Sequence, residues 1–194
     1  MKILKVLMIV SVFFLHESCS RKIARIDSNT NTDLSGAWND TDSRLTSQEI
    51  TTQVLTEAWL AKFKEQNPGK DPVVIVGIIT NKSHEHIEAE TFSKDIEKAF
   101  ITSQKVRLVQ GGKKREEIRG ERADQQENSS KSTMKQWGLE MGADFMMQGE
   151  INSIVDSYKK EKTVFYQINL ELTNIQTNEV VWIGEKKIKK LVKN

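Results

Sequence analysis

The stretch that decides the fold is PVVIVGIITN, residues 72–81. Between its proline and its threonine every residue is Val, Ile or Gly, so apolar side chains point to both faces of an extended strand. A strand with one solvated face alternates apolar and polar residues, whereas an uninterrupted apolar run is typical of a strand covered on both faces. We therefore predict a central strand here, in a sheet with helices packed against it.

Helical patterns flank this strand. Thr46 and Glu49 fit a capping box, and apolar residues at helical spacing then predict one helix that ends near Asn67. After the strand, apolar residues three and four apart predict an amphipathic helix over residues 89–103. A short strand at 106–109 completes a strand–helix–strand crossover.

The second half of the chain reads as helices and then strands. Residues 113–128 are almost wholly polar and predict an exposed helix, and residues 131–141 predict another. Strands are predicted at 145–155, at 164–173, where apolar and polar residues alternate strictly, and at 180–187. The predicted fold is a single α/β domain, a mixed sheet of about five strands flanked by helices in the order α-β-α-β-α-α-β-β-β.

The N-terminus has the pattern of a targeting segment. Residues 1–18 combine early lysines with an apolar core too short to span a bilayer, as in a signal peptide. Cys19, the single cysteine, follows directly, where a bacterial lipoprotein carries its lipid. We predict lipidation at Cys19, a polar tether over 19–33 and a globular domain over 34–194. The alternative is a cleaved signal peptide followed by a free thiol.

No catalytic, metal or cofactor pattern stands out. His84, Glu85 and His86 are adjacent, but a zinc site needs three or four ligands, and no second cluster accompanies them. The carboxylates of Glu85, Glu88 and Glu90 are explained by the dipole of the helix that follows. Because nucleophile and phosphate-loop motifs are also missing, we predict a protein that is not an enzyme and binds no cofactor.

Two further groups of residues have alternative readings. Trp38 and Trp59 could be binding aromatics, but we favour core packing. The lysines near the C-terminus could contact anionic lipid or a cell-wall polymer, and we favour an edge strand whose charges prevent aggregation; they are Lys186, Lys187, Lys189, Lys190 and Lys193. The formal net charge of +2 gives no reason to expect nucleic-acid binding.

Several of these segments together resemble the LpoB family over residues 33–190. They are DLSGAWND, PVVIVGIITNKS, ITSQKVRLV, MGADFMMQGEI and INLELTNIQTNEVVWIGE. The last two are also similar to relatives of the curli-secretion lipoprotein and to the N-terminal domain of TolB, so they indicate fold more than function. DLSGAWND is the more family-specific segment.

The resemblance implies an outer-membrane lipoprotein on the periplasmic side that binds and activates a class A penicillin-binding protein. Ser20 after the cysteine, by resemblance to diderm lipoproteins, likewise implies the outer membrane. The alternative function is that of an assembly or secretion-complex lipoprotein. One departure is the tether, which is long in the enterobacterial family member, whereas here residues 20–33 reach at most about 50 Å.

Overall fold

The computed structural model describes residues 23–135 and 140–193. The predicted signal peptide and Cys19 lie outside these residues. Residues 23–30 are exposed and form neither helix nor strand, and a compact unit runs over Asn31–Asn194. Its elements are α2 (Asp40–Thr56), α3 (Ala58–Gln66), β1 (Val73–Asn81), α4 (Glu90–Ser103), β2 (Arg107–Leu108), α5 (Gly112–Asn128), β3 (Phe145–Tyr158), β4 (Glu161–Asn174) and β5 (Val180–Lys193).

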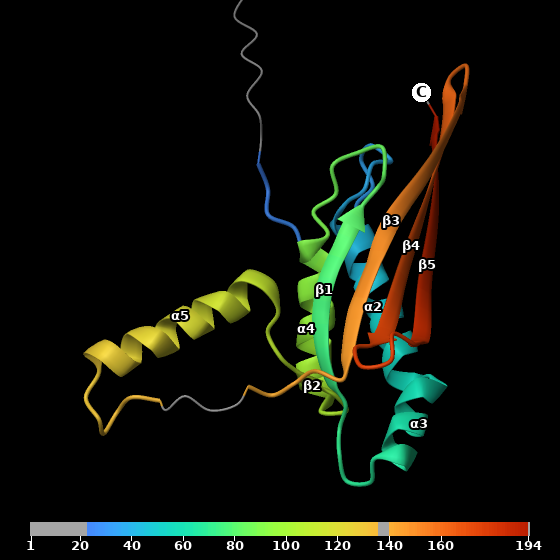
Figure 1. Cartoon of the computed structure of the whole chain (residues 1–194). Helices are drawn as coiled ribbons and strands as arrows, with labels where there is room; N and C mark the ends of the chain where they lie inside the picture. Colours follow the sequence, from blue (N-terminus) through green and yellow to red (C-terminus); the bar gives the residue numbers. More distant parts are fainter. Residues whose placement is uncertain (1–22, 136–139, 194) are drawn as a thin grey trace, which may run out of the picture. The chain divides into compact units, whose positions relative to one another are not determined.

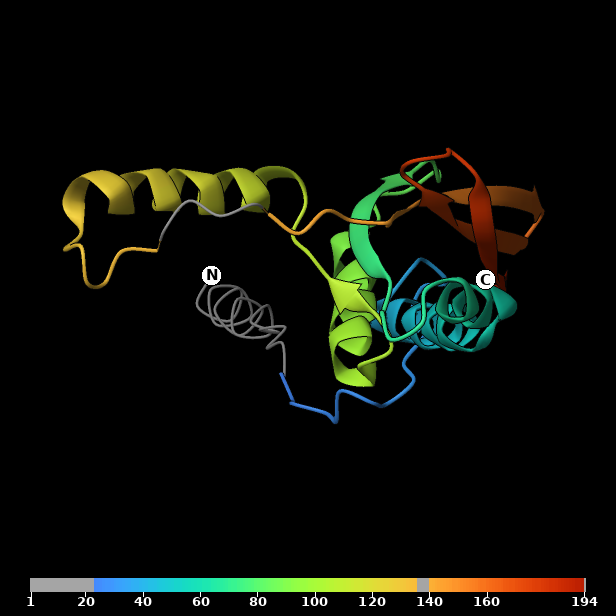
Figure 2. The same ribbon diagram turned by 60° about the horizontal axis from the view of Figure 1, so that its bottom comes forward.

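The strands form one five-stranded mixed sheet in the order β2-β1-β3-β4-β5. β1 is parallel to β2 and β3, whereas β3, β4 and β5 are antiparallel. Helices α2, α3 and α4 lie on one side of this sheet (Figures 1 and 2). The predicted mixed α/β fold and the β1–α4–β2 crossover are confirmed, and the sheet has one face covered by helices and one open face.

The core lies between the covered face of the sheet and helices α2 and α4. On β4 the alternation is as predicted, because Val164, Tyr166, Ile168, Leu170 and Leu172 are each at most 1% exposed. The helices contribute side chains that are fully buried, namely Ile50, Val54, Phe92, Ile96 and Phe100. Each such side chain contributes about 1.5–3 kcal/mol when it leaves water. This face therefore supplies most of the stability.

β1 differs from its prediction in one respect. Val74 and Ile75 are 0% and 6% exposed, but Ile78 is 76% exposed, so only the first half of the strand is covered on both faces. The connection before α5 supplies the second cover, since a Cβ built on Gly111 would lie 2.8 Å from Ile75 Cγ2. No described segment covers Ile78 in the same way. The central strand of the sheet is β3 rather than β1.

The first helix also begins earlier than predicted and is interrupted. Its N-cap is Asn39, which forms a capping box with Asp42, whereas Thr46 is buried inside the helix. Glu57 has an extended backbone and divides the predicted helix into α2 and α3. Both Asn39 with Asp42 and Thr46 with Glu49 fit a capping box in the sequence. The ion pair between Asp42 and Lys190 of β5 favours the earlier one.

α5 is the predicted exposed helix, and none of its residues is buried. The helix predicted at 131–141 is not found in its described parts, residues 131–135 and 140–141. Glu140 instead pairs with Arg119 and Arg122 of α5, each at 3.0 Å, and these contacts hold the returning chain beside that helix. None of the described helices is both long and apolar enough to cross a membrane.

Candidate functional site

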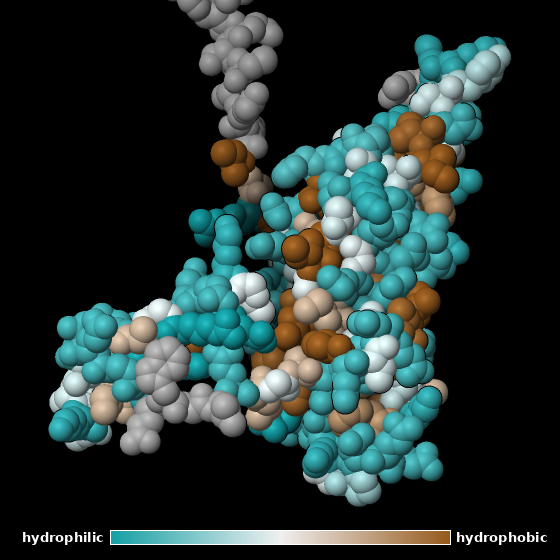
Figure 3. All heavy atoms as spheres, viewed as in Figure 1, coloured by the Kyte–Doolittle hydropathy of each residue, from teal (hydrophilic) through white to brown (hydrophobic). Residues whose placement is uncertain are grey.

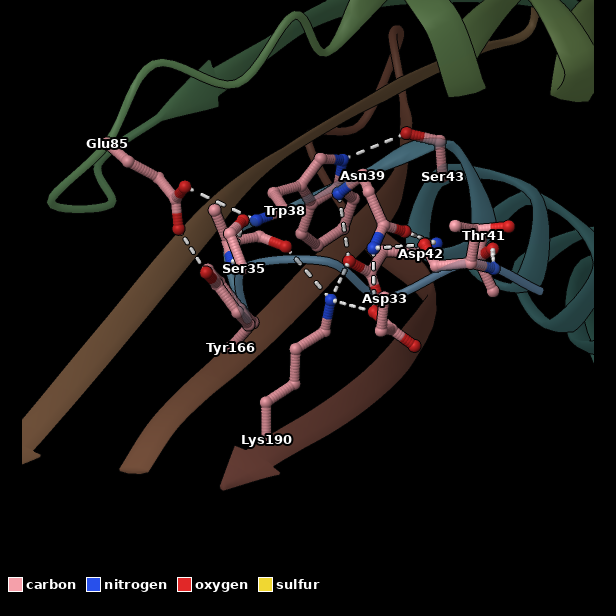
Figure 4. A network of polar contacts seen from close by, with 12 residues as sticks. Asp33, Ser35, Trp38, Asn39, Thr41, Asp42, Ser43, Glu85, Tyr166 and Lys190 are labelled. Atoms are coloured by element: carbon pink, nitrogen blue, oxygen red, sulfur yellow. Dashed lines mark hydrogen bonds and ion pairs between the residues drawn. The ribbon is translucent and has the colours of Figure 1, made fainter. Parts of the chain in front are cut away.

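The DLSGAWND segment, residues 33–40, is held against the C-terminal strand by one lysine. Lys190 of β5 places its Nζ 2.8 Å from Asp33 Oδ1, 2.6 Å from Asp42 Oδ2 and 2.9 Å from the carbonyl oxygen of Ala37. The Lys190 side chain is only 11% exposed and that of Asp42 only 5%. Figure 4 shows Lys190 pointing into this cluster. We call these contacts the Lys190 latch.

The contacts of the latch favour the charged forms of Lys190 and Asp33. Burial by itself lowers the pKa of Lys190, but the hydrogen bonds to Asp33 and Asp42 outweigh it and raise the pKa. The pKa of Asp33 is lowered, first by its hydrogen bond from Lys190 and then by one from Asn39. A half-buried ion pair is strong only when its hydrogen bonds are satisfied. Asp33, Asp42 and the carbonyl of Ala37 together satisfy the ammonium group of Lys190.

A second set of contacts joins the same segment to the loop after β1. Glu85 accepts hydrogen bonds from the Tyr166 hydroxyl and, at 3.2 Å, from the backbone N–H of Trp38. The Trp38 indole donates to Ser43 Oγ at 2.9 Å, and its ring packs edge-on against Tyr166 at 5.5 Å. Burial, followed by the bond to Glu85, raises the pKa of Tyr166. Figure 4 shows the carboxylate of Glu85 reaching toward both Trp38 and Tyr166 from the loop after β1.

The residues of the His84–Glu85–His86 stretch therefore have roles that the sequence did not reveal. Glu85 lies before α4, which begins at Glu90, so dipole compensation does not explain it. His84 stacks on Tyr166 and places Nδ1 2.7 Å from Ser153 Oγ. Among the described residues no group of three or more His, Cys, Asp or Glu is arranged to hold a metal ion.

The tryptophans and the lysine run are now placed. Trp59 is 6% exposed, and Trp38 packs against the core, which confirms core packing for both. The lysines lie on β5, an edge strand, as favoured. Lys186 and Lys190 are the exceptions, because their register positions opposite buried Ile168 and Val164 turn them toward the covered face. Lys189, next to Lys190, is exposed on the open face.

Apolar side chains gather on the open face near the end of the β3–β4 hairpin. Ile154 is 66% exposed, Tyr158 73% and Leu191 57%. Half-buried Phe165 pairs with Ile154 on one side and with Lys189 on the other. By strand alternation these four apolar residues share one face, and we call them the hairpin patch. Figure 3 shows hydrophobic atoms on this part of the surface.

The surroundings of the hairpin patch match those of a protein contact. Exposed apolar patches with a polar rim mark interaction sites on soluble domains. Here Lys189 and Lys193 lie on the same face beside the patch, and Lys193 pairs with Glu161 at 3.2 Å. The arrangement can bind an apolar surface with an acidic rim. The latch, in contrast, has its polar groups paired with each other and serves to hold the domain together.

The comparisons with known proteins identify the family. A family model described as peptidoglycan-synthase activator LpoB matches residues 42–188, from α2 through most of β5. The chain belongs to the LpoB family. Members of this family are activators of peptidoglycan synthases, so the resemblance seen in the sequence is confirmed. No curated protein matches the chain significantly.

Solved LpoB structures are similar to this chain at low identity. The C-terminal domain of LpoB from Salmonella enterica is 15% identical, with 73% of this chain and 96% of that chain covered and a TM-score of 0.39. LpoB from Escherichia coli, solved by NMR, is 13% identical, with 91% of this chain and 81% of that chain covered and a TM-score of 0.38.

Proposed function

We propose that this LpoB-family protein is lipid-anchored at the outer membrane and, from its periplasmic face, binds a class A penicillin-binding protein. Binding would stimulate that enzyme's glycan polymerisation and cross-linking. The observation that carries the proposal is the family match over residues 42–188. The protein itself would perform no chemistry, and its effect would come from binding alone.

Activation of this kind requires only that the protein bind one state of the synthase better than another. A preference of about 1.4 kcal/mol shifts the equilibrium between two states tenfold. A contact centred on a few buried apolar side chains supplies such a preference. We assign this contact to the hairpin patch, with Lys189 facing acidic groups of the synthase.

The Lys190 latch supports the assignment. It ties the distal part of β5 to α2 through Asp42, and Tyr166 ties β4 to the loop that carries Glu85. A surface held by such contacts loses little conformational freedom on binding, and that improves affinity. The latch would therefore act on function indirectly, by keeping the hairpin patch in one conformation.

The anchor is proposed at Cys19. Several acyl chains on one cysteine bury enough methylene groups for stable attachment to a membrane. The full chain with Cys19→Ser should leave the membrane fraction and appear in the aqueous fraction after phase separation. Unchanged membrane partitioning of this variant would show that something else anchors the protein.

The activating role is tested with the organism's own class A penicillin-binding proteins in detergent. Glycan-strand synthesis and cross-linking are measured with and without the full chain, and the binding of each synthase is measured in parallel. We expect at least one synthase to bind and to work faster. If none binds or accelerates, the activator proposal fails, and the assembly-lipoprotein alternative takes its place.

A further inference from the structure

The two edges of the sheet are protected very differently. β5 forms one edge, and its lysines deter pairing with another strand. At the other edge β2 covers only the start of β1, where Val73 and Val74 pair with Arg107 and Leu108. From Val76 onward β1 has no neighbouring strand on this side among the described residues. We call residues 76–81 the β1 edge.

The backbone of the β1 edge presents unpaired groups to this side. The carbonyl of Val74 accepts a hydrogen bond from Val109 N–H on the β2 side at 3.1 Å. Backbone groups of a strand alternate in direction from one residue to the next. The N–H and C=O of Val76, two residues after Val74, therefore point to the same side as the Val74 carbonyl. The pairing of β1 with β3 shifts register between Val76 and Ile79. Beyond this shift the Lys82 N–H donates to the Ile151 carbonyl of β3, so the backbone groups of Ile79 and Asn81 point to the free side.

The β1 edge lines a groove rather than a flat surface. Ile78 and Ile79 belong to its floor, Ser93 and Glu97 of α4 to one wall, and Gly112 and Lys114 of α5 to the other. Figure 3 shows apolar atoms exposed along this part of β1. No residue of the β1 edge is charged. The edge thus lacks the protection that β5 has, although it is framed by helices.

We propose that the β1 edge binds a single extended segment of a partner protein by strand addition. In this mode backbone hydrogen bonds supply affinity, and alternate side chains supply specificity. The edge itself decides the occupant: the free backbone groups of Val76, Ile79 and Asn81 pair best with another extended backbone, and they lie in the groove between α4 and α5. The inference goes beyond the proposed function and does not depend on it.

The charges of the groove define the segment further. Lys113 and Lys114 on the α5 wall form no ion pair within the described residues, and neighbouring Lys94 lowers the pKa of Lys114. Glu88, Glu90, Lys94 and Glu97 line the groove on the α4 side, and Glu117 of α5 lines it beside the two lysines. Because charges of both signs line the groove, the segment should carry small apolar residues at alternate positions and little net charge.

The test uses a labelled nine-residue peptide of alternating Val and Thr with a Lys at one end and an Asp at the other, titrated against the full chain in detergent. We expect saturable binding, together with slower hydrogen exchange of the amides at 76–81. N-methylation of the peptide backbone on one edge should weaken binding by about tenfold or more, because it removes the ladder donors.

A variant of the protein gives an independent readout. Ile79→Pro removes an edge donor that β3 does not use, so binding of the peptide should weaken while circular dichroism stays unchanged. If this variant fails to fold, the N-methylated peptide still decides. The proposal is overturned if both peptides bind equally, if exchange at 76–81 does not slow, or if sedimentation shows dimers of the full chain that Ile79→Pro dissociates.

Discussion

The two faces of the same sheet have opposite characters. On the covered face, Tyr166, Ile168 and Leu170 of β4 are fully buried against α2 and α4. On the open face of the neighbouring strands, Ile154 of β3 and Ile183 of β5 are 66% and 61% exposed. Since alternate residues of one strand serve the two faces, the covered face can fix the fold while the open face stays free to bind. Substitutions on the two faces should therefore affect different properties.

The largest effect is expected from a charge on the covered face. Ile168→Asp would bury an unpaired carboxylate and cost more than about 4 kcal/mol, a large part of the stability of a typical domain. Ile183→Asp is the matched control, because it places the same charge on the open face. Denaturant unfolding followed by circular dichroism measures both. Equal loss of stability in the two variants would contradict the assignment of the faces.

Two neighbouring lysines of β5 sharpen the comparison. Lys190→Met leaves the Asp42 carboxylate, 5% exposed, without its cation, and should cost about 3 kcal/mol. Lys189→Met removes an exposed charge on the other face and should change stability by less than about 0.5 kcal/mol. Thermal unfolding of both variants checks this. The latch is disproved as a stabilising contact if Lys190→Met unfolds at the same temperature as Lys189→Met.

Alkaline pH should weaken the contacts of Lys190 and Tyr166. The pKa values of Lys190 and Tyr166 are raised above their ordinary values of 10.5 and 10.0. Above pH 10 the folded protein therefore holds protons that the unfolded chain releases, so stability falls as pH rises. The contribution is complete below these ordinary values and is lost as pH rises through the folded ones. Thermal unfolding midpoints are measured at about unit intervals between pH 8 and 11. They should fall less steeply with pH for Lys190→Met than for the parent.

The smallest effect on stability is expected from the Tyr166 hydroxyl. Tyr166→Phe keeps the ring against Trp38 but removes the donor to Glu85, at a cost of about 1 kcal/mol. The same substitution at Tyr158, which is 73% exposed, is the control and should be neutral. Urea unfolding midpoints distinguish the two. A neutral Tyr166→Phe would mean that Glu85 finds an equivalent partner in solvent.

The sequence predicted the elements that follow local patterns and missed the contacts between residues far apart in the chain. Strict alternation in β4 and helical spacing in α4 are local patterns, and they predicted the strands and the helix packed on them. The latch depends on Lys190 meeting Asp42, 148 residues earlier in the chain. Glu85 likewise meets Tyr166 from 81 residues away. No local pattern marks such pairs, and β1 looked covered because its free half is as apolar as its buried half.

The proposed contact for the synthase lies on the open face of the sheet. Ile154→Asp and Ile101→Asp form a matched pair, because Ile154 of the hairpin patch is 66% exposed and Ile101 of α4 is 64% exposed. The measurement is stimulation of glycan synthesis by a bound class A penicillin-binding protein across a concentration series of each full-length variant.

We predict that Ile154→Asp needs at least about tenfold more protein for half-maximal stimulation, as for a central contact residue, while Ile101→Asp matches the parent. Both variants should unfold at the parent's temperature. Full stimulation by folded Ile154→Asp would contradict the hairpin patch as the binding surface.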